Sequence, residues 1–202
     1  MNKLIILVIL VYSQYSYSYI KSDFDANWGV SFVDITLDGV GTRSLESYST
    51  IKLDYNLIFS SLDMALVFSM SEMFESNFGT IPYTRFGIGP RWYIRGINGN
   101  RVLLDNQVQG RLWKPSPFIG LQLGFGSLSL EDGADVQLKS DFNAAVIDTT
   151  LEIGLETPVS ANMVFIGHFS YLMSALSSSD ETRPALSYSG IQLFVGLKMT
   201  QF

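Results

Sequence analysis

Apolar and polar residues alternate with a period of two through most of this chain, and this alternation constrains the fold more than any other feature. In residues 50–59, five apolar side chains share one face: Ile51, Leu53, Tyr55, Leu57 and Phe59. The other face is polar except for Ile58. Because successive side chains of a strand point to opposite faces, the segment is predicted to be a β-strand with one apolar and one polar face.

The same alternation recurs along the chain and predicts eight strands. The regular ones are residues 50–59, 84–95, 119–126, 147–156 and 191–200, and the less regular ones are residues 27–37, 63–73 and 162–173. Within residues 27–37 the apolar phase slips after Phe32, which indicates a bulge or a wrongly placed strand boundary. A strand of about ten residues is long enough to cross a bilayer at a tilt.

The links between the predicted strands alternate in length. Short links follow the second and sixth strands, and longer links follow the first, third, fifth and seventh. This is the pattern of a membrane barrel with tight periplasmic turns and longer outer loops. Residues 97–116 break the pattern, because they form a long link where a short turn is expected.

The N-terminus has the three parts of a secretory signal peptide. Lys3 supplies a positive charge, residues 4–11 are unbroken apolar, and Ser16-Tyr17-Ser18 offers small residues for cleavage. The apolar run is too short for a transmembrane helix. We therefore expect residues 1–18 to be removed and residues 19–202 to form one domain; the alternative is an uncleaved anchor.

Composition excludes several kinds of site. The net charge is −6 without any basic run, which argues against a nucleic-acid partner. The chain has no cysteine and a single histidine, His168, which excludes thiolate chemistry, disulfides and multi-histidine metal sites. We expect no metal and no cofactor.

The alternation does not say which face points outward. A soluble ligand-binding barrel would enclose its apolar face, whereas a membrane barrel turns that face to lipid. The polar face is rich in glycine, as a narrow eight-stranded interior requires: Gly87, Gly89, Gly120, Gly124, Gly126, Gly154 and Gly196. It also carries both signs of charge, and the chain ends in Phe202, a terminal aromatic of the kind that barrel-assembly machinery recognises. These features favour the membrane barrel.

The charged side chains of the polar face are predicted to meet inside the barrel. They are Lys52, Asp54, Arg85, Arg91, Arg95, Asp148, Glu152, Glu156 and Lys198. One interpretation is a selective pore lining. The other, which we favour, is an ion-pair network that fills the lumen, because eight strands leave only enough room for side chains.

Aromatic residues near the ends of the predicted strands suggest an interfacial girdle. They are Trp28, Phe59, Trp92, Trp113 and Tyr171. In a soluble barrel the same residues would be ordinary core.

His168 and Ser170 lie two residues apart and therefore on the same side of a strand. A serine beside a histidine is the start of a nucleophile and base pair, and Glu181 is the candidate for orienting the imidazole. The alternative is a polar pair that faces the lumen near the outer rim.

The chain resembles the small eight-stranded outer-membrane barrels of the opacity and attachment type. The signal peptide, residues 86–93 (FGIGPRWY), residues 117–124 (PFIGLQLG) and the terminal Phe202 carry this resemblance. Members include adhesins, structural proteins, narrow pores and enzymes. The His-x-Ser pair followed by a glutamate also looks like that of the outer-membrane lipid A deacylases, although Tyr171 stands where that family has an asparagine.

We therefore predict an all-β, up-and-down, antiparallel transmembrane barrel of about eight strands in the outer membrane of a Gram-negative bacterium, with both termini periplasmic. The leading hypothesis is a monomeric structural or surface-interaction barrel that is not an open channel. Its expected partners are outer-membrane lipid, lipopolysaccharide and the assembly machinery. Lipid A deacylation and soluble ligand binding are the competing hypotheses.

Overall fold

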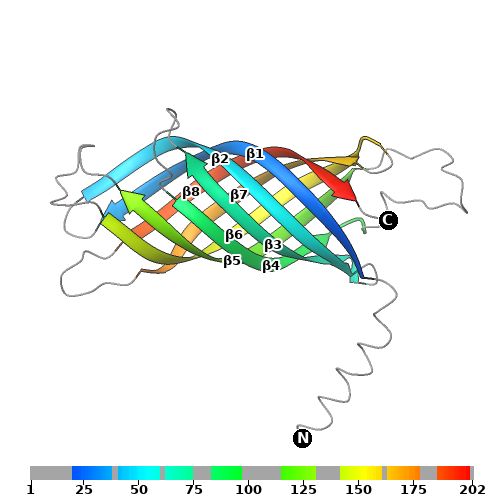
Figure 1. Ribbon diagram of the computed structural model, residues 1–202, viewed down its shortest axis with the longest axis horizontal. Coiled ribbons are helices and arrows are strands. Elements are labelled where there is room, and N and C mark those ends of the chain that lie inside the picture. The colour runs from blue at the N-terminus through cyan, green and yellow to red at the C-terminus, as the bar shows by residue number, and fades with distance from the viewer. Residues whose placement is uncertain are drawn as a thin grey trace, which may run out of the picture.

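The computed structural model describes residues 20–37, 41–59, 62–74, 83–96, 115–130, 142–160, 163–177 and 186–200. The strands are β1 (Ile20–Leu37), β2 (Gly41–Phe59), β3 (Met64–Phe74), β4 (Tyr83–Tyr93), β5 (Ser116–Leu130), β6 (Phe142–Pro158), β7 (Met163–Ser177) and β8 (Leu186–Thr200). Each strand pairs antiparallel with its neighbours in the chain, and β8 pairs with β1 to close the barrel (Figure 1). The predicted eight-stranded up-and-down barrel is confirmed.

The two ends of the barrel carry different connections. The short links at residues 60–63 and 159–162 lie at the end where β1 begins and β8 finishes, which we call the terminal end. β1, β3, β5 and β7 finish at the opposite end of the barrel, which we call the loop end (Figure 1). Among the described residues there is no helix with the length and apolarity of a membrane span.

Several strands extend farther than the alternation predicted. β2 begins at Gly41, nine residues before the expected start, so the link after β1 is only residues 38–40 and the longer loop predicted there is wrong. The cause is visible in the sequence: residues 41–49 are polar at most positions, so no apolar face marks them as strand. The expected signal peptide and most of the long link, residues 97–114, lie outside the described residues.

The register shifts opposite Val33, but the extra residue is in β2, so the phase slip that was predicted to be a bulge within residues 27–37 has another cause. Val33 pairs with Glu46 and Ile35 pairs with Arg43, so β2 has one extra residue at this point. The side chains nevertheless keep alternating, because Phe32 is exposed while Val33 and Ile35 are buried inside the barrel. The apolar phase slips because the interior itself becomes apolar toward the loop end.

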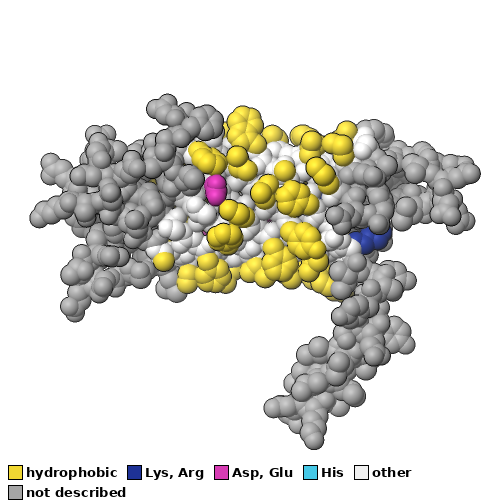
Figure 2. Space-filling model, viewed as in Figure 1, with side chains coloured by type: hydrophobic (Ala, Val, Ile, Leu, Met, Phe, Trp, Pro, Cys, Tyr) yellow, Lys and Arg dark blue, Asp and Glu magenta, His cyan; other side chains and the backbone are white. Residues whose placement is uncertain are grey.

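The outer wall of the barrel is apolar and the interior is polar. The exposed apolar side chains include Ile51, Leu53, Tyr55, Phe86, Ile88, Leu121, Leu123, Phe125, Leu151, Ile153, Leu193 and Val195, and Figure 2 shows such residues spread over one face of the wall. The residues between them on the same strands are buried. This is the arrangement of a transmembrane barrel, so the soluble alternative, which needs the apolar face inside, is wrong.

Candidate functional site

The interior of the barrel holds ten buried ionic side chains among the described residues. β1 contributes Asp23 and Asp25, β2 contributes Lys52 and Asp54, β4 contributes Arg85 and Arg91, β6 contributes Asp148, Glu152 and Glu156, and β8 contributes Lys198. They occupy inward positions because the alternation of each strand places them opposite the lipid-facing side chains. We call this set the lumen network.

Arg91 lies at the centre of the lumen network and is fully buried. Its Nη1 is 3.2 Å from Asp25 Oδ2, and its Nη2 is 3.0 Å from Asp54 Oδ2 and 3.2 Å from Glu152 Oε2. The guanidinium also lies 4.5 Å from the centre of the Phe118 ring. One side chain of β4 therefore links carboxylates of β1, β2 and β6 across the lumen.

Two lysines extend the network on either side of Arg91. Lys52 pairs with Glu152, and its Nζ is 3.4 Å from Asp54 Oδ2. Lys198 Nζ lies 2.5 Å from Glu156 Oε1 and 3.8 Å from Asp25 Oδ1. Lys52 is thus shared between two carboxylates and Lys198 among three, the third being Asp23 at 4.0 Å. Several of the carboxylates are likewise shared between cations.

A second group of polar contacts lies nearer the loop end, around Asp148. Arg85 Nε donates to Asp148 Oδ1 at 2.8 Å, and the hydroxyls of Tyr83 and Tyr188 both donate to Asp148 Oδ2. A side chain at Gly124 would overlap Arg85 and Asp148. Gly124 is on β5, which lies between β4 and β6, and its lack of a side chain leaves the space in which the Arg85 guanidinium reaches Asp148.

Two clusters of buried apolar side chains, which we call the apolar layers, also lie inside the barrel. Toward the loop end the buried cluster is Val33, Ile35, Tyr48, Met73, Tyr83, Val146, Leu172 and Tyr188. Toward the terminal end it is Ile58, Ala65, Tyr93, Phe118 and Ile166. These layers explain why the alternation is less regular in residues 63–73, since the buried Met73 belongs to the first cluster and the buried Ala65 to the second.

The structure brings together eight of the nine charged residues that the sequence analysis assigned to the lumen. Arg95 is the correction. β4 ends at Tyr93, and a turn follows in which Gly96 N donates to Tyr93 O at 3.1 Å with Gly96 at a φ of 77°. The alternation therefore stops before Arg95, which is exposed at the terminal end.

The sequence analysis missed several residues of the interior. Asp23 and Asp25 precede the expected start of the first strand, although the alternation of Phe24 and Ala26 with these acids was a usable signal. Tyr93 and Gln122 were also missed: Tyr93 donates to Glu156 at 2.9 Å, and Gln122 Nε2 donates to Glu152 at 3.2 Å.

The predicted aromatic girdle is only partly at the strand ends. Phe59 and Trp92 both pair with Met64 near the terminal end. Trp28 and Tyr171 point outward but lie in the middle of β1 and β7, because both strands are longer than predicted. Trp113 and Phe202 lie outside the described residues.

The candidate catalytic pair is not assembled. His168 and Ser170 are both buried in the lumen, and within the described part of the chain neither His168 nitrogen nor Ser170 Oγ has a hydrogen-bond partner. The imidazole instead stacks on Phe194, with ring centres 4.8 Å apart. Both residues are nearer the middle of the barrel than the outer rim, and Glu181 lies outside the described residues. Among the described residues no group of three or more acidic or histidine side chains is placed to hold a metal ion.

No protein-family model and no curated protein matches the sequence. Solved structures do match its fold. Neisserial surface protein A is 12% identical with a TM-score of 0.53, covering 88% of this chain and 97% of its own. The N-terminal β-barrel domain of Pseudomonas aeruginosa OprF is 10% identical with a TM-score of 0.51, covering 89% of this chain and 98% of its own.

At these identities the comparison establishes the fold, which is that of the small outer-membrane β-barrel proteins. The resemblance expected from the sequence is confirmed at this level, and the apolar outer wall agrees with an outer-membrane location.

Proposed function

We propose that this chain is an integral outer-membrane barrel with a structural or surface-interaction role, and that its lumen is closed rather than conducting. The observation that carries the proposal is the position of Arg91, which bridges Asp25, Asp54 and Glu152 from three other strands while fully buried. A pore of the selective kind would need its charged side chains to line a path that ions can enter.

The two apolar layers support closure independently of the charges. Phe118, Tyr93 and Ile166 fill the barrel toward the terminal end, and Tyr83, Tyr188 and Leu172 are among those that fill it toward the loop end. Four of these six residues are aromatic, and all six are at most 5% exposed. An ion crossing the barrel would have to leave its water shell at both layers, and desolvation of an ion in apolar surroundings is very costly.

The role of such a barrel lies at its surfaces, not in a catalytic centre. His168 and Ser170 are enclosed among aromatic and charged side chains and lack the mutual hydrogen bond that a nucleophile and base need. The apolar wall is the surface for outer-membrane lipid, including lipopolysaccharide on the loop side. The loop end is the surface for a partner outside the cell, and the assembly machinery is the partner during insertion.

Planar-bilayer recording tests the closed lumen. We expect the folded wild-type barrel to give no stepwise conductance in 1 M salt at any applied voltage that the bilayer tolerates. The double variant Tyr93→Ala with Phe118→Ala removes two rings from the terminal layer and is expected to raise ion leakage. Phe125→Ala, which removes a ring of the same kind from the outer wall, should leave the current unchanged. Regular open steps in the wild-type barrel would contradict the proposal.

A further inference from the structure

One position in the lipid-facing wall lacks a side chain. Gly167 points outward from β7, between Phe165 and Phe169, while its neighbours in register are Leu155 on β6 and Val195 on β8. Followed further across the sheet, the same register row runs to Pro117 on β5 and to Trp28 on β1. The row therefore crosses five strands and is interrupted at its centre.

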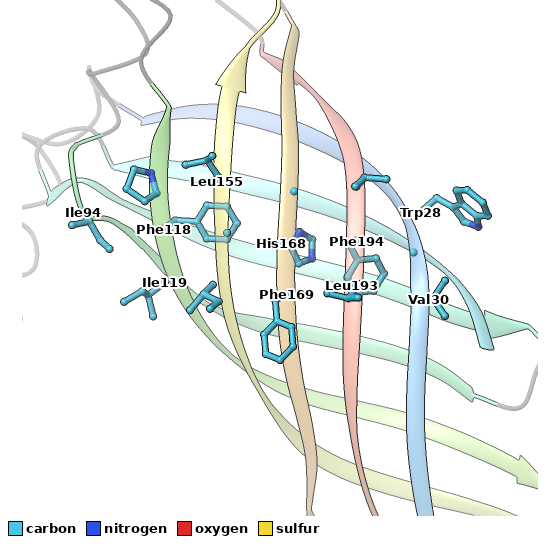
Figure 3. A pocket seen from close by; sticks show the side chains of 16 residues that line it. Trp28, Val30, Ile94, Phe118, Ile119, Leu155, His168, Phe169, Leu193 and Phe194 are labelled. Carbon is cyan, nitrogen blue, oxygen red and sulfur yellow. The ribbon is translucent and has the colours of Figure 1, made fainter. Parts of the chain in front are cut away.

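A hollow of about 790 Å³ follows this row along the outer wall. Its second side is the adjacent row, Ile119, Ile153, Phe169, Leu193 and Val30, and Ile94 lies at one end (Figure 3). The lining side chains that face outward are all apolar. We call this hollow the wall groove.

We propose that the wall groove seats one acyl chain of a zwitterionic phospholipid from the membrane leaflet at the terminal end. The groove is continuous with the apolar wall that faces the bilayer, so hydrocarbon chains are its immediate surroundings. Four steps between adjacent strands span about 19 Å, and one leaflet of a hydrocarbon core is about 15 Å thick. The groove thus has the length of a single extended chain.

The direction of the groove identifies the leaflet. Pro117 is the second residue of β5, whereas Trp28 is the ninth residue of β1, so the row moves away from the terminal end as it crosses the sheet. A chain that follows the groove would place its headgroup beside Ile94 and its methyl end near Trp28.

Charged side chains at the end of the wall groove beside Ile94 suit a zwitterionic headgroup. Arg95 is exposed immediately after Ile94, where it can meet a phosphate. Asp63 lies on the same rim, with its Oδ1 3.0 Å from the point that a Cβ on Gly96 would occupy. A base and an acid side by side match a phosphate and an ammonium better than they match a purely anionic headgroup.

The attraction has to come from packing and from the headgroup, because moving a chain from one hydrocarbon environment to another gives no hydrophobic gain. Filling the groove should therefore remove the preference. A Cβ on Gly167 would meet its nearest atoms, Phe165 Cε1 and the Phe194 carbonyl oxygen, only at 3.9 Å, so Gly167→Leu fits the backbone. Ala26→Leu is the matched control, since Ala26 is exposed on the wall outside the groove.

Native mass spectrometry of barrels released from nanodiscs tests the proposal, with dipalmitoyl phosphatidylethanolamine as the probe and phosphatidylglycerol of the same chains as the comparison. We expect wild type and Ala26→Leu to retain one phosphatidylethanolamine and Gly167→Leu to lose it. Arg95→Gln, which leaves the barrel packing untouched, should lower the retained fraction about fivefold. Circular dichroism establishes that each variant is folded.

A second readout uses the end of the wall groove near Trp28, where the methyl end of the acyl chain is expected. In a Trp92→Phe, Trp113→Phe background, phospholipid brominated near its methyl end should quench Trp28 fluorescence, and Gly167→Leu should relieve this quenching. Equal lipid retention and equal quenching in wild type and Gly167→Leu would overturn the proposal. A wild-type dimer that the Gly167→Leu variant cannot form would also overturn it, because a second barrel and not a lipid would then fill the wall groove. The inference rests on the membrane location of the proposed function but not on closure of its lumen. A silent barrel that retains no lipid refutes the groove alone, and a conducting barrel that retains one refutes closure alone.

Discussion

Replacing Arg91 by methionine is the perturbation that most directly probes the interior of the barrel. Methionine keeps much of the side-chain length but has no charge, so Asp25, Asp54 and Glu152 lose the cation that lies among them. The described lumen then has three cations left for six carboxylates: Lys52, Arg85 and Lys198 against Asp23, Asp25, Asp54, Asp148, Glu152 and Glu156.

The expected destabilisation follows from burial. Removing one partner of a buried ion pair costs about 3–5 kcal/mol, because the remaining charge stays desolvated. Lys52 and Lys198 still contact these carboxylates, so we expect the lower part of that range, about 3 kcal/mol. With a urea dependence of about 2 kcal/mol per molar, the unfolding midpoint should fall by roughly 1.5 M.

Equilibrium urea unfolding in lipid vesicles, followed by tryptophan fluorescence, measures this shift. Asp54→Asn in the Arg91→Met background removes one uncompensated charge while keeping shape, and should restore at least half of the lost stability. A loss below about 1 kcal/mol for Arg91→Met would refute the role of Arg91 as the central cation. If the double variant is as unstable as the sum of the two single variants, packing and not charge explains the loss.

Three further predictions follow from individual contacts. Tyr83→Phe removes a donor to the buried carboxylate of Asp148 and should lower the unfolding free energy by about 1–3 kcal/mol in the same urea assay, whereas an unchanged midpoint would remove Tyr83 from the network. Gly89→Ala places a methyl group against the backbone of β5 and should lower the unfolding free energy by about 1–3 kcal/mol, whereas Gly167→Ala should leave it nearly unchanged. Equal losses for the two variants would contradict the close approach of Gly89 to β5 and the open space at Gly167. Leu123→Arg puts a charge on the lipid face near mid-strand and should cost about 2–4 kcal/mol in bilayers, and a neutral result would place Leu123 outside the membrane.

The strands and their orientation were accessible from sequence because the bilayer imposes a simple pattern. Where the wall meets lipid and the interior is charged, as in residues 147–156, apolar and polar residues alternate with Thr149 as the one exception, and the predicted strand lies within β6. The glycines opposite large side chains were an equally physical signal, since Gly124 makes room for Arg85 and Asp148.

The pattern failed where one of the two environments changes. Residues 41–49 are polar at most positions and have no apolar face, so the extension of β2 gave no signal. Inside the apolar layers both faces of a strand are apolar. The buried Val33 and Ile35 therefore look in the sequence as if the apolar face had changed sides, although the alternation continues. Arg95 was misplaced because alternation predicts a face but not where a strand ends.

The partners within the lumen were not predictable from alternation. That Arg91 would meet Asp25, which lies outside the predicted first strand, depends on the closure of β1 against β8 and on the register of all eight strands. The wall groove likewise depends on register, because Gly167, Trp28 and Pro117 become neighbours in one row only in the closed barrel.

The central claim is that the aliphatic side chains face lipid and the charged side chains face inward, and spin-label accessibility tests it most directly. The chain has no cysteine, so single cysteines at Leu151, Ile153 and Leu155 of β6 can each carry one nitroxide. In bilayers we predict that all three labels collide freely with dissolved oxygen and are shielded from a water-soluble nickel chelate. Labels that the nickel chelate reaches at these three positions would place the apolar face in water and contradict the claim.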